Sequence, residues 1–456
     1  MNQALLDYYR LPADLLLGTA ESESGNLGFF RFGAENVCFG RKQTGVATNL
    51  AGSAQFDASK EIHRNGSTIQ LPFSFREVVD NLRLERYRQK IVPARETFVA
   101  NAVSHKLYYR VRRFLPVTAR RKLQRLYFSD WKKLPFPAWP VDFTVDTLHE
   151  EFLRILMETS GVKKIPFIWF WPNGAPNCLM MTHDVETAAG RDFTSQLMDL
   201  DDAYGMKSSF QVIPEKRYEV PDGYVQEIRA RGFEFNVHDL NHDGHLYRER
   251  KEFVRRAASI NGYVRKYNCQ GFRAGAMYRN QDWYDLFEFS YDMSVPNVAH
   301  LEPMRGGCCT VMPYFVGKIL ELPLTAAQDY SLFHILNDYS IDLWKKQLTL
   351  IGRRHGLMSF IAHPDYLIEH RARSVYESLL IYLRELIDRE KIWAALPAEI
   401  DRWWRARSQM SIVRQGKDWK IVGPEKERAR LAYAVLDGNR VVYELSEVMC
   451  QENQNC

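Results

Sequence analysis

The sequence predicts an α/β protein: a distorted parallel (β/α) barrel with an N-terminal β-rich and helical extension and a small C-terminal β module. First, short apolar runs alternate with helical patterns across residues 147–400. Second, ionisable residues directly follow several of these runs, as in the stretch from Thr182 to Glu186. Barrel enzymes carry their functional groups at the carboxyl ends of parallel strands, so this placement favours one shared site. Third, two-residue periodicity returns in residues 401–456, which predicts the β module.

Composition is that of an ordinary globular protein, and it excludes several classes. The chain has 456 residues, 46% hydrophobic and 26% charged, which predicts two or three domains with ample core. The first residues lack the pattern of a secretion signal, and no apolar run reaches membrane-spanning length. The seven cysteines, with Cys308 and Cys309 adjacent, show neither disulfide nor zinc-finger spacing. We therefore expect a cytoplasmic, reduced setting, and the net charge of +5 is too small to indicate a partner.

Residues 1–75 are predicted to form a β-rich region. Residues 28–32 and 37–40 are β-rich pieces separated by Gly, Asn and Ser. Ser74 and Glu77 have capping-box spacing, which predicts that a helix begins there. No residue pattern in this region indicates chemistry.

Residues 76–146 are predicted to be a helical basic arm followed by a proline-rich linker at residues 135–140. Within residues 103–133 only Asp130 opposes a run of basic residues, and Pro116 divides the run into two helical pieces. The basic residues are Lys106, Arg110, Arg112, Arg113, Arg120, Arg121, Lys122, Arg125, Lys132 and Lys133. Three interpretations stay open: a solvated arm that clasps the main domain, contact with an anionic membrane surface, or nucleic-acid binding. Nucleic acid is the least favoured partner, because the arm contains no recognised binding module.

Residues 147–400 are predicted to form the barrel, and their strands and helices follow one another in order. After the apolar run that ends at Thr182, the predicted strands are residues 208–213, 233–237, 271–273, 319–322 and 357–362. The predicted helices are residues 148–157, 223–230, 251–267, 340–352 and 374–389. In the last module, Asp437-Gly438-Asn439 lies between two alternating segments and predicts a hairpin.

Two histidines, His238 and His242, follow the predicted strand at residues 233–237. At this spacing they would lie one above the other on a helical turn, close enough to share a metal. His245 would be one turn too far away to join them. His183 neighbours Asp184 and should point to the opposite face of its strand.

The ordered motifs together resemble the polysaccharide deacetylase family, also called the NodB-homology domain or carbohydrate esterase 4, as a divergent member. The motifs are Thr182-His183-Asp184-Val185-Glu186, His238-x-x-x-His242, Phe272-Arg273-Ala274, Tyr291-Asp292-Met293-Ser294 and His363-Pro364. The resemblance covers about residues 165–395 and implies a metal-dependent N- or O-deacetylase that acts on carbohydrates.

The resemblance also implies a role for each matching residue. Asp184 would be the catalytic base, Arg273 would orient it, and His363 would be the catalytic acid. The metal ligands would be Glu186, His238 and His242. The first motif is similar to that of a divergent subgroup with Asp-x-Asp in place of adjacent aspartates.

Three positions depart from the family pattern. Glu186 stands where the metal ligand is usually Asp, Gly275 where a proline usually follows, and Asp239 where a small hydroxyl residue is usual. Because glutamate is still an adequate oxygen ligand, we interpret these changes as a shifted site and not as an inactive one. Asp239 and Asp243 are expected to be solvated or to cap a turn. Asp329 has two open interpretations, orienting His363 or capping a helix.

The residue types suit metal-assisted hydrolysis. A divalent metal held by two imidazoles and one carboxylate keeps positions open for water and substrate. We expect zinc, with cobalt or manganese as alternatives. We expect a hydrolase that removes an acetyl group from an N-acetylated sugar in cell-surface polysaccharide metabolism. A cytoplasmic setting favours a lipid- or nucleotide-linked substrate. The alternatives are a catalytically silent barrel that binds glycan or a partner protein, and hydrolysis of another amide.

Overall fold

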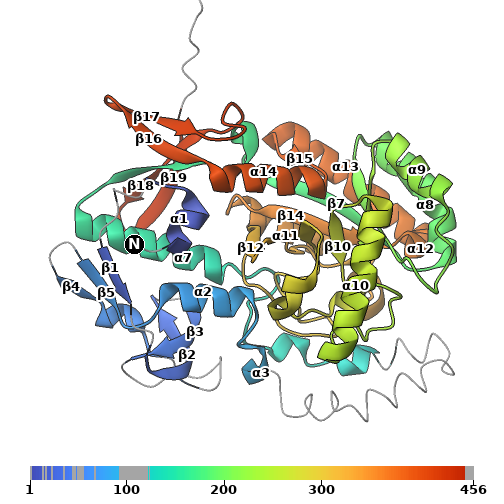
Figure 1. The fold of residues 1–456 in the computed structure, drawn as a ribbon, viewed down its shortest axis with the longest axis horizontal. Coiled ribbons are helices and arrows are strands. Elements are labelled where there is room, and N and C mark those ends of the chain that lie inside the picture. Colours follow the sequence, from blue (N-terminus) through green and yellow to red (C-terminus); the bar gives the residue numbers. More distant parts are fainter. Residues whose placement is uncertain are drawn as a thin grey trace, which may run out of the picture.

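The computed structural model describes residues 3–12, 15, 18–21, 24–33, 36–43, 48, 56–65, 68–91, 122 and 124–446. A curled parallel sheet surrounded by helices forms the larger part of the molecule, and smaller sheets lie beside it (Figure 1). The predicted fold class, a distorted parallel (β/α) barrel with extensions at both ends, is confirmed. Within the described residues, no helix combines the length and the apolar character needed to cross a membrane.

The main sheet has the strand order β12-β13-β11-β10-β9-β8-β7-β14, and β15 also pairs with β7. Its parallel strands are β7 (Cys178–Val185), β8 (Ser208–Val212), β9 (Glu234–His238), β10 (Gly271–Arg273), β11 (Tyr291–Asp292), β13 (Ile319–Glu321), β14 (Leu357–Ala362) and β15 (Trp393–Ala394). β12 (Tyr314–Val316) is antiparallel to β13. All the strands that precede the motif residues therefore end at one edge of the sheet.

Helices connect these strands and cover the outside of the sheet. They are α8 (Ala188–Ala203), α9 (Asp222–Ala230), α10 (Arg250–Tyr267), α11 (Asp342–Gly352), α12 (Pro364–Leu367), α13 (His370–Glu390) and α14 (Pro397–Gln409). Shorter turns are η4 (Pro172–Gly174), η5 (Gly275–Met277), η6 (Gln281–Leu286) and the π-helix η7 (Ser331–Leu336). One apolar core joins strand residues such as Phe210 and Phe235 to helix residues such as Leu197, Ile260 and Leu383.

The barrel is closed by a loop instead of by a ninth strand pair. β14 lies at one end of the sheet order, β12 and β13 lie at the other end, and β14 pairs with neither of them. The segment after β13 bridges the gap, because Ala326 N donates to Ser359 O and Ser359 Oγ donates to Pro323 O. This closure explains the distortion and carries the chain directly to Asp329.

The two ends of the chain share a second core beside the barrel. The N-terminal elements are α1 (Gln3–Tyr9), β1 (Gly18–Glu21), β2 (Asn26–Phe32), β3 (Asn36–Lys42), η2 (Ala58–Glu61), β4 (His63–Asn65), β5 (Thr68–Leu71), α2 (Phe75–Arg83) and α3 (Arg88–Ile91). Ser74 Oγ accepts from Glu77 N at the start of α2, so the predicted helix begins where its capping pair stands. Phe29, Phe152, Phe167 and Ala432 belong to this one core.

The C-terminal β module contains two hairpins, and one of them extends a strand that precedes the barrel. The strands are β16 (Ser411–Gln415), β17 (Asp418–Val422), β18 (Leu431–Asp437) and β19 (Arg440–Leu445). β18 pairs with β19 across the predicted turn, and also with β6 (Lys164–Ile168). The helix α7 (Thr144–Ser160) packs between these strands and the N-terminal region.

Most of the basic arm lies outside the described residues, including Lys106 and the arginines from Arg110 to Arg121. Its described end, which includes η3 (Trp131–Lys133), packs against the barrel. Phe128 is buried against Leu301 and Ile335, and Arg125 Nε donates to His334 O. This part of the arm fits the clasp interpretation.

Candidate active site

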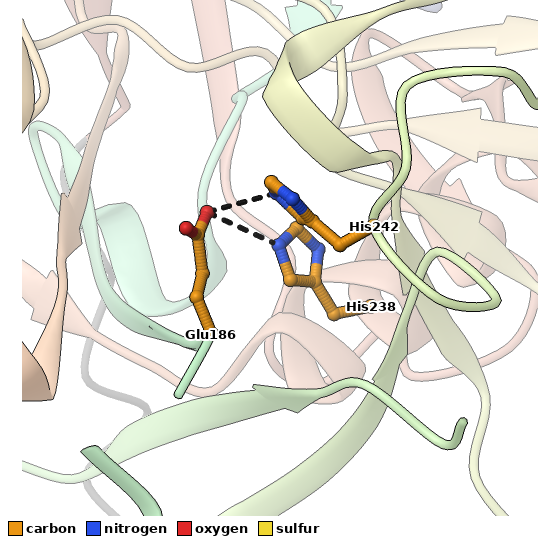
Figure 2. Close-up of side chains that lie close together, drawn as sticks. All are labelled: Glu186, His238 and His242. Atoms are coloured by element: carbon orange, nitrogen blue, oxygen red, sulfur yellow. Dashed lines mark ion pairs between the residues drawn. The ribbon is translucent and has the colours of Figure 1, made fainter. Parts of the chain in front are cut away.

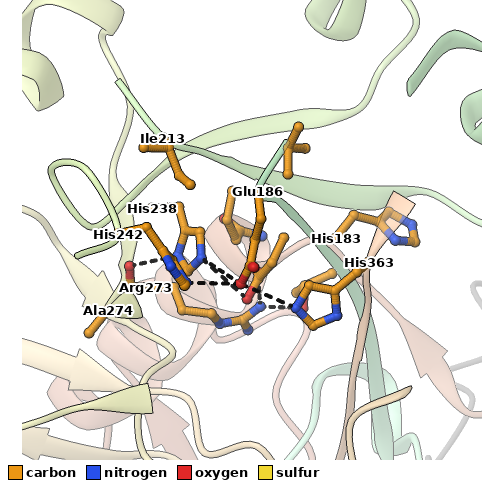
Figure 3. A network of polar contacts seen from close by, with 12 residues as sticks. His183, Glu186, Ile213, His238, His242, Arg273, Ala274 and His363 are labelled. Carbon is orange, nitrogen blue, oxygen red and sulfur yellow. Dashed lines mark hydrogen bonds and ion pairs between the residues drawn. The ribbon is translucent and has the colours of Figure 1, made fainter. Parts of the chain in front are cut away.

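Four strands of the main sheet deliver the motif residues to one place. Asp184 lies near the end of β7 with Glu186 just beyond, His238 ends β9, Arg273 ends β10, and His363 follows β14. Because these strands are parallel, their carboxyl ends meet at the same edge of the sheet. Figure 3 shows Glu186, His238, His242, Arg273 and His363 directed toward one another.

Glu186, His238 and His242 form a potential metal-binding group. Their ligand atoms all lie within 4.8 Å of one another. Glu186 Oε1 is 2.9 Å from His242 Nε2 and 3.8 Å from His238 Nε2 (Figure 2). His238 is almost completely buried, while the side chain of Glu186 is 24% exposed. Of the three side chains, that of Glu186 is therefore the most exposed to solvent.

The spacing of His238 and His242 predicted that they lie on one helical turn, and this prediction is wrong. His238 is the last residue of β9, and His242 lies in the following loop. Asp239 and His242 both have a positive φ, 53° in each case, in a region that non-glycine residues rarely adopt. The loop, and not a helix, turns the second imidazole back toward the first. Backbone strain of this kind clusters at functional sites.

The donor set fits a divalent cation. His238 Nδ1 faces the carbonyl oxygen of Arg273 at 3.1 Å, so this nitrogen carries the proton and leaves a lone pair on Nε2. His238 Nε2 and His242 Nε2 are both buried, and both face the carboxylate of Glu186. Two buried nitrogens beside a carboxylate oxygen are typical ligands for zinc. The residues present therefore fit a divalent cation.

Asp184 is held beside this group by Arg273. Arg273 Nη1 donates to Asp184 Oδ1 at 2.7 Å and to Thr182 Oγ1 at 2.8 Å, and its Nε donates to Met293 O at 3.0 Å. Burial raises the pKa of Asp184, but Arg273, His238 and His363 lower it by more, so its pKa lies below its ordinary value. Asp184 is thus an ionised carboxylate, 3.8 Å from His238 Nε2 through Oδ2.

His363 faces the same centre and is oriented by Asp329. The Nδ1 atom of His363 is 2.6 Å from Asp329 Oδ1, and His363 N donates to Asp329 Oδ2 at 2.6 Å. Its Nε2 lies 3.6 Å from Glu186 Oε1. Burial lowers the pKa of His363, but Asp329 and then Glu186 raise it by more, so the pKa lies well above its ordinary value. Of the two interpretations of Asp329, the contacts favour the orientation of His363.

Gly275 and Asp239, two of the departures from the family pattern, lie against each other. A Cβ atom at Gly275 would be 2.6 Å from Asp239 Oδ2 and 2.9 Å from the His242 ring. Of the two alternatives expected for Asp239, solvated or capping, burial contradicts the first; its Oδ1 accepts from the backbone Leu240 N. A side chain at position 275 would therefore crowd both Asp239 and His242, so the glycine and the aspartate fit each other in space.

The other candidate residues lie away from the centre. His183 points to the opposite face of β7, as its position predicted (Figure 3), where it contacts Ala362 O and Asp201. His245 is 39% exposed and lies near Asp243, not among the ligands. Asp243 accepts from His245 N and forms a two-point ion pair with Arg256, so it caps this turn.

The structure shows functions for several residues to which the sequence analysis assigned none. The motif from Tyr291 to Ser294 positions Arg273, because Met293 O accepts from Arg273 Nε and Ser294 Oγ accepts from Ala274 N. The centroid of the Tyr366 ring lies 4.7 Å from that of the His363 ring and 4.7 Å from that of the His334 ring. Only the position of Tyr366, three residues after His363, signalled this cluster in the sequence.

Comparisons with known proteins find likeness in structure alone. No protein-family model matches the chain, and no curated protein matches it in sequence. A Mycobacterium smegmatis protein classed as a polysaccharide deacetylase matches with a TM-score of 0.43 and 17% identity, over 55% of this chain and 98% of its own. The Puue allantoinase matches with a TM-score of 0.42 and 12% identity, over 52% and 92%. A Bacillus subtilis peptidoglycan deacetylase matches with a TM-score of 0.32 and 11% identity, over 51% and 93%.

The family that the motifs resemble is thus represented among the structural matches. These likenesses are distant and cover about half of the chain. The function proposed below therefore rests on the residues of the site.

Proposed function

We propose that the protein is a metal-dependent hydrolase that removes the acetyl group from an N-acetylated sugar. One observation carries the proposal: a two-histidine, one-carboxylate group lies between an ionised aspartate and a histidine that is held by a second aspartate. These are the groups that amide hydrolysis needs, namely a base, an acid and a site for an electrophile. The acetylated sugar as substrate comes from the resemblance of the motifs.

Glu186, His238 and His242 would hold the metal. When bound, a divalent metal lowers the pKa of water and polarises the acetyl carbonyl. Zinc suits these ligands, with cobalt or manganese as alternatives. His238 is prepared for this role because its Nδ1 atom is already bonded to Arg273 O.

Asp184 is placed to act as the base. It accepts a proton from the attacking water, which then forms the bond to the acetyl carbon. Arg273 keeps this carboxylate ionised and fixes one of its oxygens, which leaves Oδ2 free to face the ligand group. The base and the ligand group are thus joined through Arg273, whose carbonyl oxygen also holds His238.

His363 is placed to act as the acid. Asp329 holds its Nδ1 atom, so Nε2 faces Glu186 and carries the proton that the leaving amine needs. When the bond between the acetyl carbon and the nitrogen breaks, His363 gives this proton to the sugar nitrogen. The products are acetate and an amino sugar.

Acetate release tests the proposal directly. We expect the purified full-length chain, supplied with zinc, cobalt or manganese, to release acetate from at least one N-acetylated sugar in a panel of free, nucleotide-linked and lipid-linked substrates. The chelated protein should release none, because the ligand group then lacks its cation.

The same panel separates the alternatives. If no sugar releases acetate with any metal but another amide is hydrolysed, the protein is a metal-dependent amide hydrolase with a different substrate. Absence of any hydrolysis would favour a silent binding barrel, for which replacement of Glu186 or His242 should leave glycan binding intact.

We further propose that the protein works at the cytoplasmic surface of the membrane, which the basic arm contacts. Each Lys or Arg near an anionic surface contributes about 1 kcal/mol, so several basic residues of the arm acting together would hold the protein there reversibly. The described end of the arm lies near the candidate active site, because Arg125 bonds to His334 O, and the His334 ring packs on Tyr366 beside His363. An arm that contacts the membrane would therefore bring the site close to the membrane surface. Such an arrangement suits a lipid-linked sugar.

Vesicle sedimentation checks the arm. We expect the protein to sediment with anionic vesicles at low salt and to be released at high salt. Charge reversal at Arg112, Arg113, Arg120 and Arg121 should abolish binding, while neutral vesicles serve as the control. Equal binding by the reversed variant would reduce the arm to a structural clasp.

A further inference from the structure

The N-terminal region contacts the active-site loop at the end of α2. Gln281 Nε2 donates to Arg83 O at 2.8 Å, and Arg86 forms an exposed ion pair with Asp282 at 3.2 Å. Between these two contacts lies a buried one, from Glu85 to Arg279. The segment after β10 thus rests on a helix that lies outside the barrel.

Glu85 and Arg279 form a buried, two-point ion pair. Arg279 Nε donates to Glu85 Oε2 and Nη2 donates to Glu85 Oε1, both at 2.5 Å. Their side chains are 4% and 1% exposed, respectively. Gly307 N also donates to Glu85 Oε1, at 2.6 Å, so three donors surround this carboxylate. A paired geometry of this kind fixes position as well as charge.

The backbone at Glu85 is strained in order to hold this carboxylate in place. Glu85 follows the end of α2 with φ of 55°, in a conformation that usually requires glycine. Gly306 allows the close approach, because a Cβ atom there would lie 2.5 Å from Glu85 Oε1. The strained backbone of Glu85 and the glycine that faces its carboxylate together indicate a specific role for this side chain.

From Arg279 the contacts lead into the site. Arg279 Nη1 donates to Met277 O at 2.7 Å, and this holds η5, where Ala276 and Met277 also have positive φ. Gly275, the first residue of η5, packs against Asp239 and the His242 ring. On its other side the segment continues into Arg273, which bonds to Asp184. One loop therefore borders both the base and a metal ligand.

We propose that Glu85 is a positioning residue for the active site: through Arg279 it holds the loop from Arg273 to Arg279, and so sets the place of His242. The N-terminal region then completes the catalytic loop instead of only covering the barrel. This inference rests on the proposed function where it concerns metal binding, and on the fold alone where it concerns the loop.

The test measures hydrogen exchange of the loop and the affinity for Co²⁺ in the full chain. In Glu85→Ala, peptides that contain residues 273–282 should exchange faster than in the unchanged protein, because the loop loses its anchor. The affinity for Co²⁺ should fall roughly ten- to hundredfold, as for other groups that orient metal ligands. The visible spectrum of bound Co²⁺ should also change, which a general loss of stability would not produce.

Two further variants make the result specific. Arg86→Ala removes the exposed ion pair from the same helix end to the same segment, and it should leave exchange and affinity unchanged. Glu85→Gln keeps an oxygen that can accept from Gly307 N but loses the charge that faces Arg279, so its effect should be intermediate. This variant keeps the test decisive if Glu85→Ala does not fold. Loop exchange and Co²⁺ affinity that are the same in Glu85→Gln as in Arg86→Ala would overturn the proposal.

Failure of the proposed function would look different. If the unchanged protein binds no Co²⁺ and releases no acetate, the exchange of residues 273–282 still decides whether Glu85 holds the loop. Faster exchange in that case supports the anchoring role, and unchanged exchange contradicts it.

Discussion

Replacement of Asp184 by asparagine is expected to lower turnover by roughly a hundredfold or more while the protein keeps its metal. Asparagine has nearly the same shape, but it cannot take a proton from water. The ligand group does not include Asp184, so Glu186, His238 and His242 should bind metal as before. Arg273 loses a charged partner that is buried with it, so some stability should also be lost.

The measurement is the rate of acetate release at saturating metal, with metal content determined on the same sample. Asp192→Asn is the matched control, because Asp192 is an exposed carboxylate on the following helix. Near-normal turnover of the Asp184 variant, with one metal bound, would contradict the assignment of the base.

Replacement of His238 by alanine is expected to remove both the metal and the activity. Binding free energies of structural zinc sites are about 10–16 kcal/mol, so loss of one ligand in three weakens binding on the order of a thousandfold. The variant should stay folded, because His238 is the last residue of β9, at the carboxyl edge of the sheet, and does not belong to the apolar core. Acetate release should fall below detection.

Metal content after dialysis, with circular dichroism to check folding, measures this effect. His245→Ala is the matched control, because this histidine lies in the same loop but outside the ligand group. Retention of metal by a folded His238 variant would sink the proposed centre.

The order of strand ends made much of the candidate site predictable. Asp184, Glu186, Arg273 and His363 each follow or end an apolar run, and parallel strands must bring such residues to one edge. The barrel itself follows from the same alternation of strand and helix. Local patterns predicted these features because, once the strands are taken to be parallel, few arrangements of the strand ends remain.

Other features depend on contacts between distant segments and had no local signal. The i, i+4 spacing of His238 and His242 predicted a helical turn, but a loop with two left-handed residues joins them. Spacing cannot distinguish these two backbones, because both bring the rings together. The choice between orienting and capping for Asp329 likewise depended on the loop that closes the barrel beside β14.

The sequence by itself determined the chemistry of this protein: which side chains carry charge, protons and lone pairs, and which strand ends they follow. Only the tertiary structure decided how they are held. The pairing of Gly275 with Asp239 and the bond from Glu85 to Arg279 join residues far apart in the chain. The physical reason is that such contacts require close approach of specific atoms after folding, and neither periodicity nor residue type encodes that approach.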